Sequence, residues 1–175
     1  CIIHDINHQA IYMTGPEHTF ENNDVYGACV RDADAGMIYI AGVTAQGTVV
    51  RNNAIHDQPR AGWYFAMYLD NAASGVTIEN NYIHDISVNS ENGGIWVNGG
   101  SDVTIRDNLI VNIPNSVSGS IMPHNTNFHK IIIPPNGPTY RTLNGIYGAN
   151  SSYGDVWKTR YPNLYKLYTD IKDNI

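Results

Sequence analysis

Two aspartates border apolar, strand-like segments and could act as a catalytic pair. Asp70 ends the segment "AMYLD" two residues after Tyr68, and Asp34 lies five residues before Tyr39 in "RDADAGMIY". Glycoside cleavage needs one carboxylic acid that donates a proton and one carboxylate that attacks or activates water. The two groups lie about 5–5.5 Å apart in retaining enzymes and about 6.5–9.5 Å apart in inverting ones. We therefore take Asp34 and Asp70 as candidate catalytic residues, and Asp32 as a substitute for Asp34 or a substrate contact.

Four segments align without gaps around these acids and carry one aromatic residue each: "AIYMTG" (10–15), "MIYIAG" (37–42), "AMYLDN" (66–71) and "GIWVNG" (94–99). Strand alternation directs the aromatics outward and their aliphatic neighbours inward. Outward rings offer flat apolar faces to sugars, although they could instead stack across strands or lie under a loop. The expected substrate-binding residues are Tyr12, Tyr39, Tyr68, Trp96, Asn98 and Asp32.

The elements that must position these residues belong to a repeat. "TFENNDVYG" (19–27), "VVRNNAIHD" (49–57), "TIENNYIHD" (77–85) and "TIRDNLIVN" (104–112) share one pattern, with the second Asn at 23, 53, 81 and 108. A period of 27–30 residues with β-branched strands and a fixed Asn turn is typical of a parallel β-helix, in which equivalent residues stack at about 4.8 Å. We expect the four Asn to be structural and the "IHD" segments to form surface hydrogen bonds rather than a catalytic site.

The repeat extends over only part of the chain. We expect regular coils over 1–113, irregular coils and loops over 114–154, and a helical extension over 155–175. The last prediction rests on apolar residues spaced by 4, 3, 4 and 3 from Trp157 to Ile171, with a helix beginning near Pro162. Because "CIIHD" is the end of a further copy, we interpret the chain as one β-helix fragment, truncated at both ends, whose partners include its missing N-terminal coils.

Composition excludes several classes of function. The formal net charge is −6 and no basic stripe is present, which disfavours nucleic acid as a partner. No run of about 18 apolar residues occurs, so no membrane span is predicted. Charged residues make up 15% of the chain, below the roughly 25% of an average protein, and 21 residues are Asn, which favours turns over helices. We expect no cofactor and no metal.

Four segments carry a resemblance to a known family. "DAGMIY", "YLDNAASG", "GGSDVTIRDNLI" and "WKTRYPNL" follow one another in this chain. In this order they resemble the C-terminal part of the β-helix glycosidases of glycoside hydrolase family 141 and their relatives. The resemblance implies an all-β, right-handed parallel β-helix that cleaves plant-type glycans, with fucosidase or xylanase activity. It also implies that Asp34 and Asp70 are the catalytic pair.

The chain departs from these relatives where substrate would lie. It has "IAGVTAQG" after the Tyr39 strand, Asn71 where Asp is common, and Asn98 where His is common. These differences affect specificity more than chemistry. We expect a bacterial glycoside hydrolase, secreted or periplasmic, that acts on an oligosaccharide or polysaccharide. The alternatives are a non-catalytic carbohydrate-binding or surface β-helix and, after that, a polysaccharide lyase or epimerase.

Within the proposed pair we expect Asp70 to be the acid, because contact with Tyr68 and the other outward aromatic rings would desolvate it and raise its pKa. Asp34, on a Gly-bearing turn, would stay ionised as base or nucleophile. The reverse assignment stays open.

Overall fold

The computed structural model describes residues 1–31, 34–58, 63–86, 93–113, 117–120, 137–149 and 151–173. Asp32 therefore lies outside the described residues. The chain divides into two compact units, residues 1–123 and 124–175. The first unit consists of stacked parallel strands and the second of helices.

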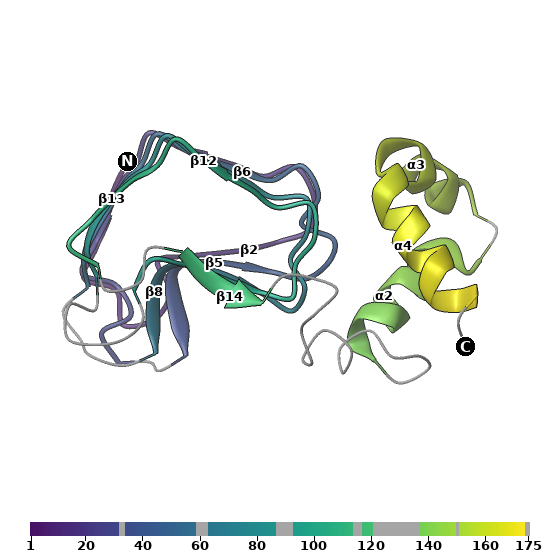
Figure 1. The fold of residues 1–175 in the computed structure, drawn as a ribbon, viewed down its shortest axis with the longest axis horizontal. Helices are drawn as coiled ribbons and strands as arrows, with labels where there is room; N and C mark the ends of the chain where they lie inside the picture. Colours follow the sequence, from purple (N-terminus) through teal and green to yellow (C-terminus); the bar gives the residue numbers. More distant parts are fainter. Residues whose placement is uncertain are drawn as a thin grey trace. The chain divides into compact units, whose positions relative to one another are not determined.

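The first unit is a parallel β-helix, the fold class that the repeat predicts. Successive turns lie over one another, and each turn adds a strand to each of three parallel sheets (Figure 1). We name the sheets A, B and C. Sheet A contains β1 (Ile2–His4), β4 (Asp24–Tyr26), β7 (Ala54–Gln58), β10 (Tyr82–Ile86) and β13 (Leu109–Val111). Sheet B contains β2 (Ile11–Thr14), β5 (Ala35–Ala41), β8 (Tyr64–Asp70), β11 (Ile95–Asn98) and β14 (Val117–Ser120). Sheet C contains β3 (Thr19–Glu21), β6 (Val49–Arg51), β9 (Thr77–Glu79) and β12 (Thr104–Arg106).

The corner between sheets C and A has two residues in every described turn: 22–23, 52–53, 80–81 and 107–108. The first residue has a positive φ between 55° and 58°, a conformation that Asn and Asp tolerate better than most residues. The second is the repeated Asn, whose side-chain amide donates to the side-chain oxygen of the next Asn along the stack at 2.9–3.1 Å. The predicted asparagine stack is therefore confirmed.

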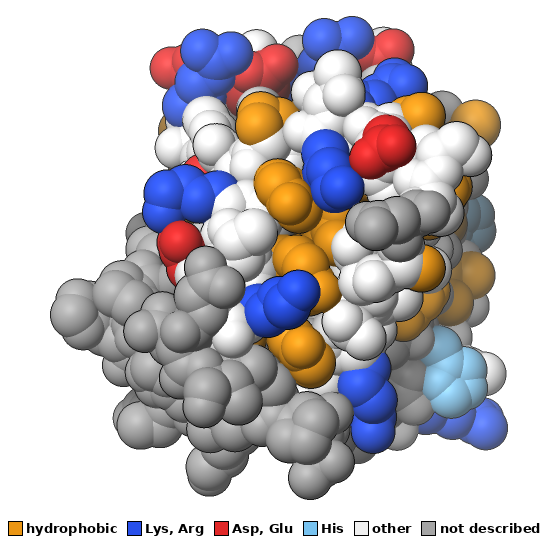
Figure 2. Space-filling view, turned by 90° about the vertical axis from the view of Figure 1, so that its right-hand side faces the viewer, with side chains coloured by type: hydrophobic (Ala, Val, Ile, Leu, Met, Phe, Trp, Pro, Cys, Tyr) orange, Lys and Arg blue, Asp and Glu red, His pale blue; other side chains and the backbone are white. Residues whose placement is uncertain are grey.

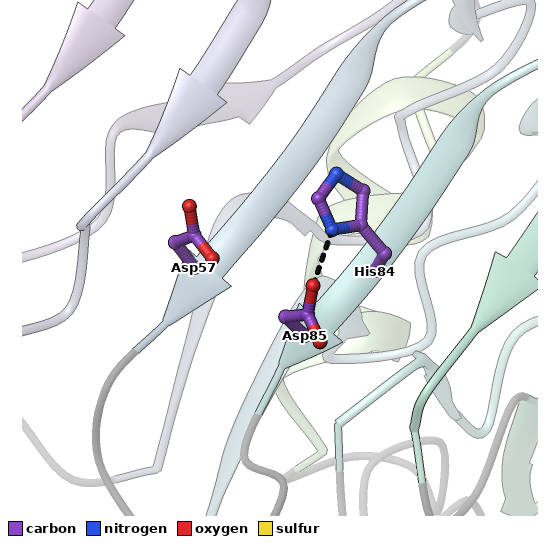
Figure 3. Close-up of side chains that lie close together, drawn as sticks. All are labelled: Asp57, His84 and Asp85. Atoms are coloured by element: carbon purple, nitrogen blue, oxygen red, sulfur yellow. Dashed lines mark hydrogen bonds and ion pairs between the residues drawn. The ribbon is translucent and has the colours of Figure 1, made fainter.

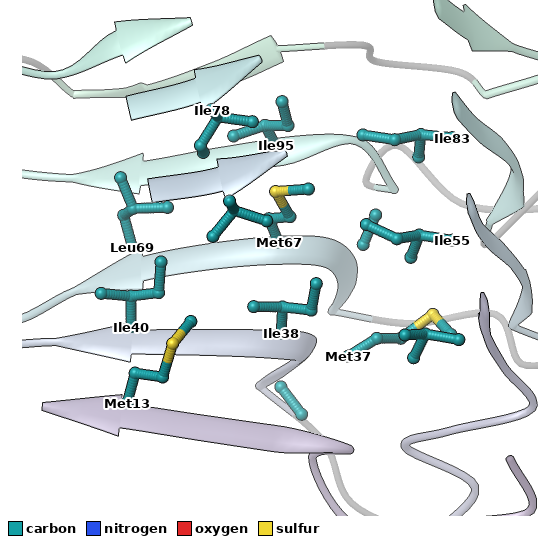
Figure 4. Close-up of a cluster of buried hydrophobic side chains, with 14 of the residues drawn as sticks. Met13, Met37, Ile38, Ile40, Ile55, Met67, Leu69, Ile78, Ile83 and Ile95 are labelled. Carbon is teal, nitrogen blue, oxygen red and sulfur yellow. The ribbon is translucent and has the colours of Figure 1, made fainter. Parts of the chain in front are cut away.

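The core lies between the sheets and is filled by aliphatic side chains. Parallel pairing aligns Ile40 with Leu69 and Leu69 with Val97, so that equivalent inward positions contact one another from turn to turn. Figure 4 shows Ile40 and Leu69 pointing into the interior, where Leu69 and Ile95 are fully buried. The predicted inward face of sheet B is thus confirmed by the burial of these positions.

The second unit contains α2 (Pro138–Tyr147), α3 (Ser152–Arg160) and α4 (Pro162–Asp173). Helix α4 begins at Pro162 as predicted, because proline suits the first turn of a helix. Helix α2 corrects the expectation of irregular structure over 114–154. Its Leu143, Ile146 and Tyr147 form a buried stripe that was obscured by the helix-poor pair Asn144 and Gly145. Among the described residues, no helix is both long and apolar enough to cross a bilayer.

Candidate functional site

Strands β5 and β8 are seven residues long and bring the two candidate acids into one region. Their pairing keeps one register, in which Gly36 aligns with Phe65 and Ile38 with Met67. A Cβ at Gly36 would lie 2.7 Å from the Cβ of Tyr68, so only glycine permits this close approach of the two strands. The start of β5, which Asp34 immediately precedes with a φ of 56°, therefore lies against Tyr68.

Asp70 is a half-buried carboxylate at the end of β8 that accepts three hydrogen bonds. The hydroxyl of Tyr39 donates to Oδ2, the amide of Asn71 donates to Oδ2 at 2.9 Å, and the amide of Asn98 donates to Oδ1 at 2.8 Å. These donors come from the previous turn, the same strand end and the next turn. Together the three donors fix the orientation of the Asp70 carboxylate.

Asp34 is exposed and accepts a hydrogen bond from the Tyr68 hydroxyl, whose oxygen in turn accepts one from the indole of Trp63. Burial, and then the charges of Asp70 and Asp34, raise the pKa of Tyr68. Burial and the hydrogen bond to Asp70 likewise raise the pKa of Tyr39, on which the charge of Asp34 also acts. The hydroxyl groups of Tyr39 and Tyr68 thus stay protonated and can donate hydrogen bonds. The charges of Asp34 and Asp70 raise the pKa of each tyrosine.

The predicted aromatic row is present, but its members differ in exposure. Tyr12 stacks on Tyr39 at 5.5 Å and is 60% exposed, whereas Tyr68, whose ring centre lies 5.0 Å from that of Tyr39, is only 5% exposed. Tyr68 therefore takes part through its hydroxyl and has no open ring face for a sugar. Trp96 is half-buried and stacks on Phe65 at 5.3 Å.

Trp63 belongs to this site, although the sequence pattern does not predict it. It lies immediately before β8, is 43% exposed, and contacts Trp96 edge-on at 5.1 Å. The available signal was its place in "GWYF", next to the strand that carries Asp70. It was missed because it falls outside the four aligned aromatic segments.

Residues 1–121 match the family model described as the right-handed β-helix region. The chain belongs to this family. The match includes Asp34 and Asp70 and extends over nearly the whole first unit. Comparisons with curated proteins and with solved structures found no match. Membership in the right-handed β-helix family thus establishes the fold and its hand, while the chemistry has to be inferred from the site.

The right-handed β-helix carries a second cluster of polar groups on sheet A. Asp57, His84 and Asp85 have potential ligand atoms within 4.8 Å of one another (Figure 3). His84 Nδ1 lies 2.7 Å from Asp85, and the same neighbouring pair recurs as His56–Asp57 at 2.9 Å and His4–Asp5 at 2.7 Å.

The ring of His84 also stacks on that of His56 at 4.7 Å. Because the arrangement repeats from turn to turn, we interpret it as the surface hydrogen bonding that the sequence predicts.

A hollow of about 610 Å³ in the helical unit is a weaker candidate. Its described lining is Asp155, Val156, Thr159 and Arg160, all from α3. Figure 2 shows the molecule from the right-hand side of Figure 1, and on this face hydrophobic side chains are interspersed with Lys and Arg. The described lining offers one carboxylate and no aromatic ring, so it lacks the paired carboxylates and rings found on sheet B.

Proposed function

We propose that this right-handed β-helix is a glycoside hydrolase that uses Asp34 and Asp70 as its catalytic pair. The observation that supports it most is the arrangement of the two carboxylates, each of which accepts a hydrogen bond from a protonated tyrosine of one aromatic cluster. Paired carboxyl groups with different surroundings are what general acid–base cleavage of a glycosidic bond requires.

The hydrogen bonds suggest how the two aspartates divide the work. Asp70 accepts hydrogen bonds from three donors that fix its orientation, and we assign to it the role of base or nucleophile. Asp34 has the Tyr68 hydroxyl as its described donor and is exposed. Because Asp34 is open to the oxygen of a leaving group, we assign the acid role to it. This reverses the assignment expected from the sequence, since Asp70 is held by three donors whereas Asp34 is exposed.

The narrower proposals rest on the resemblance described above. We propose a relationship to glycoside hydrolase family 141, a plant-type glycan as the substrate, and a secreted or periplasmic location in a bacterium. A lyase or epimerase acting on uronates fits less well, because the described side chains that contact the two carboxylates are tyrosines and asparagines rather than Lys or Arg.

The second candidate is a carbohydrate-binding β-helix without catalysis. Right-handed β-helices include glycosidases, lyases and non-catalytic proteins. The exposed ring of Tyr12 would serve binding whether or not cleavage follows.

Activity on a panel of aryl glycosides and plant polysaccharides tests the proposal. Asp70→Asn and Asp34→Asn should each lower kcat by at least about a hundredfold, the lower end of a general acid–base contribution. Asp57→Asn is the matched control, because it removes the same charge from an exposed position on sheet A and should leave kcat unchanged.

Two results would count against the hydrolase. If Asp70→Asn retains most of the activity on a confirmed substrate, Asp70 only hydrogen-bonds the end of its strand. If the unaltered chain cleaves nothing on the panel, the binding function is favoured instead.

A further inference from the structure

The aromatic rings of sheet B form a connected row that is open at its two ends. Ring contacts run from Tyr12 through Tyr39, Tyr68 and Phe65 to Trp63, with centroid separations of 5.0–5.5 Å. Tyr12 is 60% exposed and Trp63 is 43% exposed, whereas Phe65 is fully buried. We propose that Trp63 and Tyr12 are two sugar-stacking platforms of one binding strip, and that the strip takes a neutral oligosaccharide.

Trp63 is held in place before any ligand binds. Its indole N–H donates to the Tyr68 oxygen, and its ring meets Phe65 at 5.5 Å and 89° and Trp96 at 5.1 Å and 70°. A ring fixed in this way loses little conformational entropy when a sugar stacks on it. Since Tyr68 also donates to Asp34, a sugar on Trp63 lies at the Asp34 end of the strip.

Tyr12 is linked to the other carboxylate, Asp70, through one intervening tyrosine. Its ring stacks on that of Tyr39 with an interplanar angle of 14°, and the Tyr39 hydroxyl donates to Asp70. Each carboxylate is therefore linked through one tyrosine to one open ring. A sugar on Tyr12 would thus be held at the Asp70 end.

The separation of the open rings sets a minimum size for the ligand. The rings of Tyr39 and Tyr68 lie between Tyr12 and Trp63, so a single sugar cannot stack on both ends at once. A ligand that uses both platforms must contain at least two sugar units, with a glycosidic bond near the carboxylates.

The charges of the strip indicate a neutral ligand. Asp34 and Asp70 contribute two carboxylates, and the described side chains that hydrogen-bond to them are Tyr39, Tyr68, Asn71 and Asn98. None of these can neutralise a uronate, and a carboxylate in the strip would repel one. The amides and phenols instead match the hydroxyl groups of neutral sugars.

The inference rests on the proposed carbohydrate function but concerns binding, and calorimetric titration tests it separately from cleavage. The 175-residue chain carrying Asp70→Asn, which should leave the ligand intact, is titrated with xylohexaose and cellohexaose, and with xylose and glucose. We expect saturable binding of at least one hexasaccharide and none of the monosaccharides.

Adding Trp63→Ala or Tyr12→Ala should weaken that binding by at least about tenfold. The matched control is Tyr82→Ala, since Tyr82 is 44% exposed but lies on sheet A, and it should leave affinity unchanged. Trp63→Phe keeps a stacking ring without the N–H and should recover part of the affinity lost in Trp63→Ala.

Three results would overturn the inference: no binding of either hexasaccharide, unchanged affinity in a cooperatively melting Trp63→Ala variant, or monosaccharide binding as tight as that of the hexasaccharide. Failure of the hydrolase proposal gives a different result. In that case hexasaccharide binding depends on Trp63 and Tyr12, but the unaltered chain releases no reducing ends.

Discussion

Replacing Asn81 by alanine would remove the best-buried member of the asparagine stack. Asn81 is 1% exposed, and its amide donates to the backbone oxygens of Val50 at 3.0 Å and Glu79 at 3.1 Å and to the Asn108 side chain at 2.9 Å. Its side-chain oxygen accepts from the backbone N–H and the side-chain amide of Asn53 at 3.0 and 2.9 Å. The methyl group of alanine replaces none of these contacts.

The expected cost follows from the groups left unpaired. The backbone N–H of Asn53 and the backbone carbonyl of Val50 are buried within the stack and lose their side-chain partner. Each buried polar group left without a hydrogen bond costs about 1–3 kcal/mol, so the loss at these two groups should lower the free energy of unfolding of Asn81→Ala by roughly 2–6 kcal/mol. Asn108→Ala is the matched control at the more exposed end of the stack, where water can take over and the cost should be about 1–2 kcal/mol.

Urea unfolding followed by tryptophan fluorescence measures this difference. In a Trp157→Phe background the two remaining tryptophans, Trp63 and Trp96, both belong to the β-helix, so the signal reports that unit alone. Linear extrapolation then gives the free energy of unfolding for each variant. A loss below about 1 kcal/mol for Asn81→Ala, or equal losses for the two variants, would refute the view that buried amide pairing stabilises the corner.

Two further predictions concern the core and the outer face of sheet A. Leu69→Ala should lower the free energy of unfolding by about 2–5 kcal/mol, because Leu69 is fully buried. Leu109→Ala is the control, since this side chain is 60% exposed, and it should lower the free energy of unfolding by less than about 1 kcal/mol in the same urea assay. Equal losses for the two variants would contradict the difference in burial. Burial lowers the pKa of His56, but hydrogen bonds to Asp57 and Asp24 outweigh it and raise the pKa above 6.5. The stability from these contacts is therefore present below pH 6.5 and lost as the pH rises through the pKa of folded His56. Asp24→Asn should lower that pKa in an NMR titration, and an unchanged midpoint would rule out this electrostatic contact.

The regular part of the fold could be predicted because its signal repeats. A fixed Asn at 23, 53, 81 and 108 marks one corner, and the aligned apolar pairs of sheet B set which side chains face inward. A one-residue error in register would have reversed every inward position, so the pattern fixes the pairing strongly. The same periodicity placed Asp34 and Asp70 on adjacent turns.

The details of the site were less predictable because they depend on contacts between distant parts of the chain. The approach of Gly36 to Tyr68 brings Asp34 against the Tyr68 hydroxyl, and no local pattern indicates it. The burial of Tyr68 likewise depends on neighbouring rings rather than on strand alternation. Helix α2 was missed for the opposite reason, since its local propensity is poor and its stability depends on packing.

The two-residue corner has a consequence for how such a protein can diversify. The variation in turn length falls on the strands of sheets A and B and on the other two corners, which hold four to seven residues between sheets B and C and five to eight between sheets A and B. Between sheets B and C, most of 42–48 and 71–76 is buried, and the exposed positions there are Gly47 and Asn71. An insertion costs least at an exposed position, where it displaces little packing. An insertion beside Asn71 would reshape the neighbourhood of Asp70 while the asparagine stack keeps every turn in register, so this position is a natural grafting point for altering the proposed binding surface.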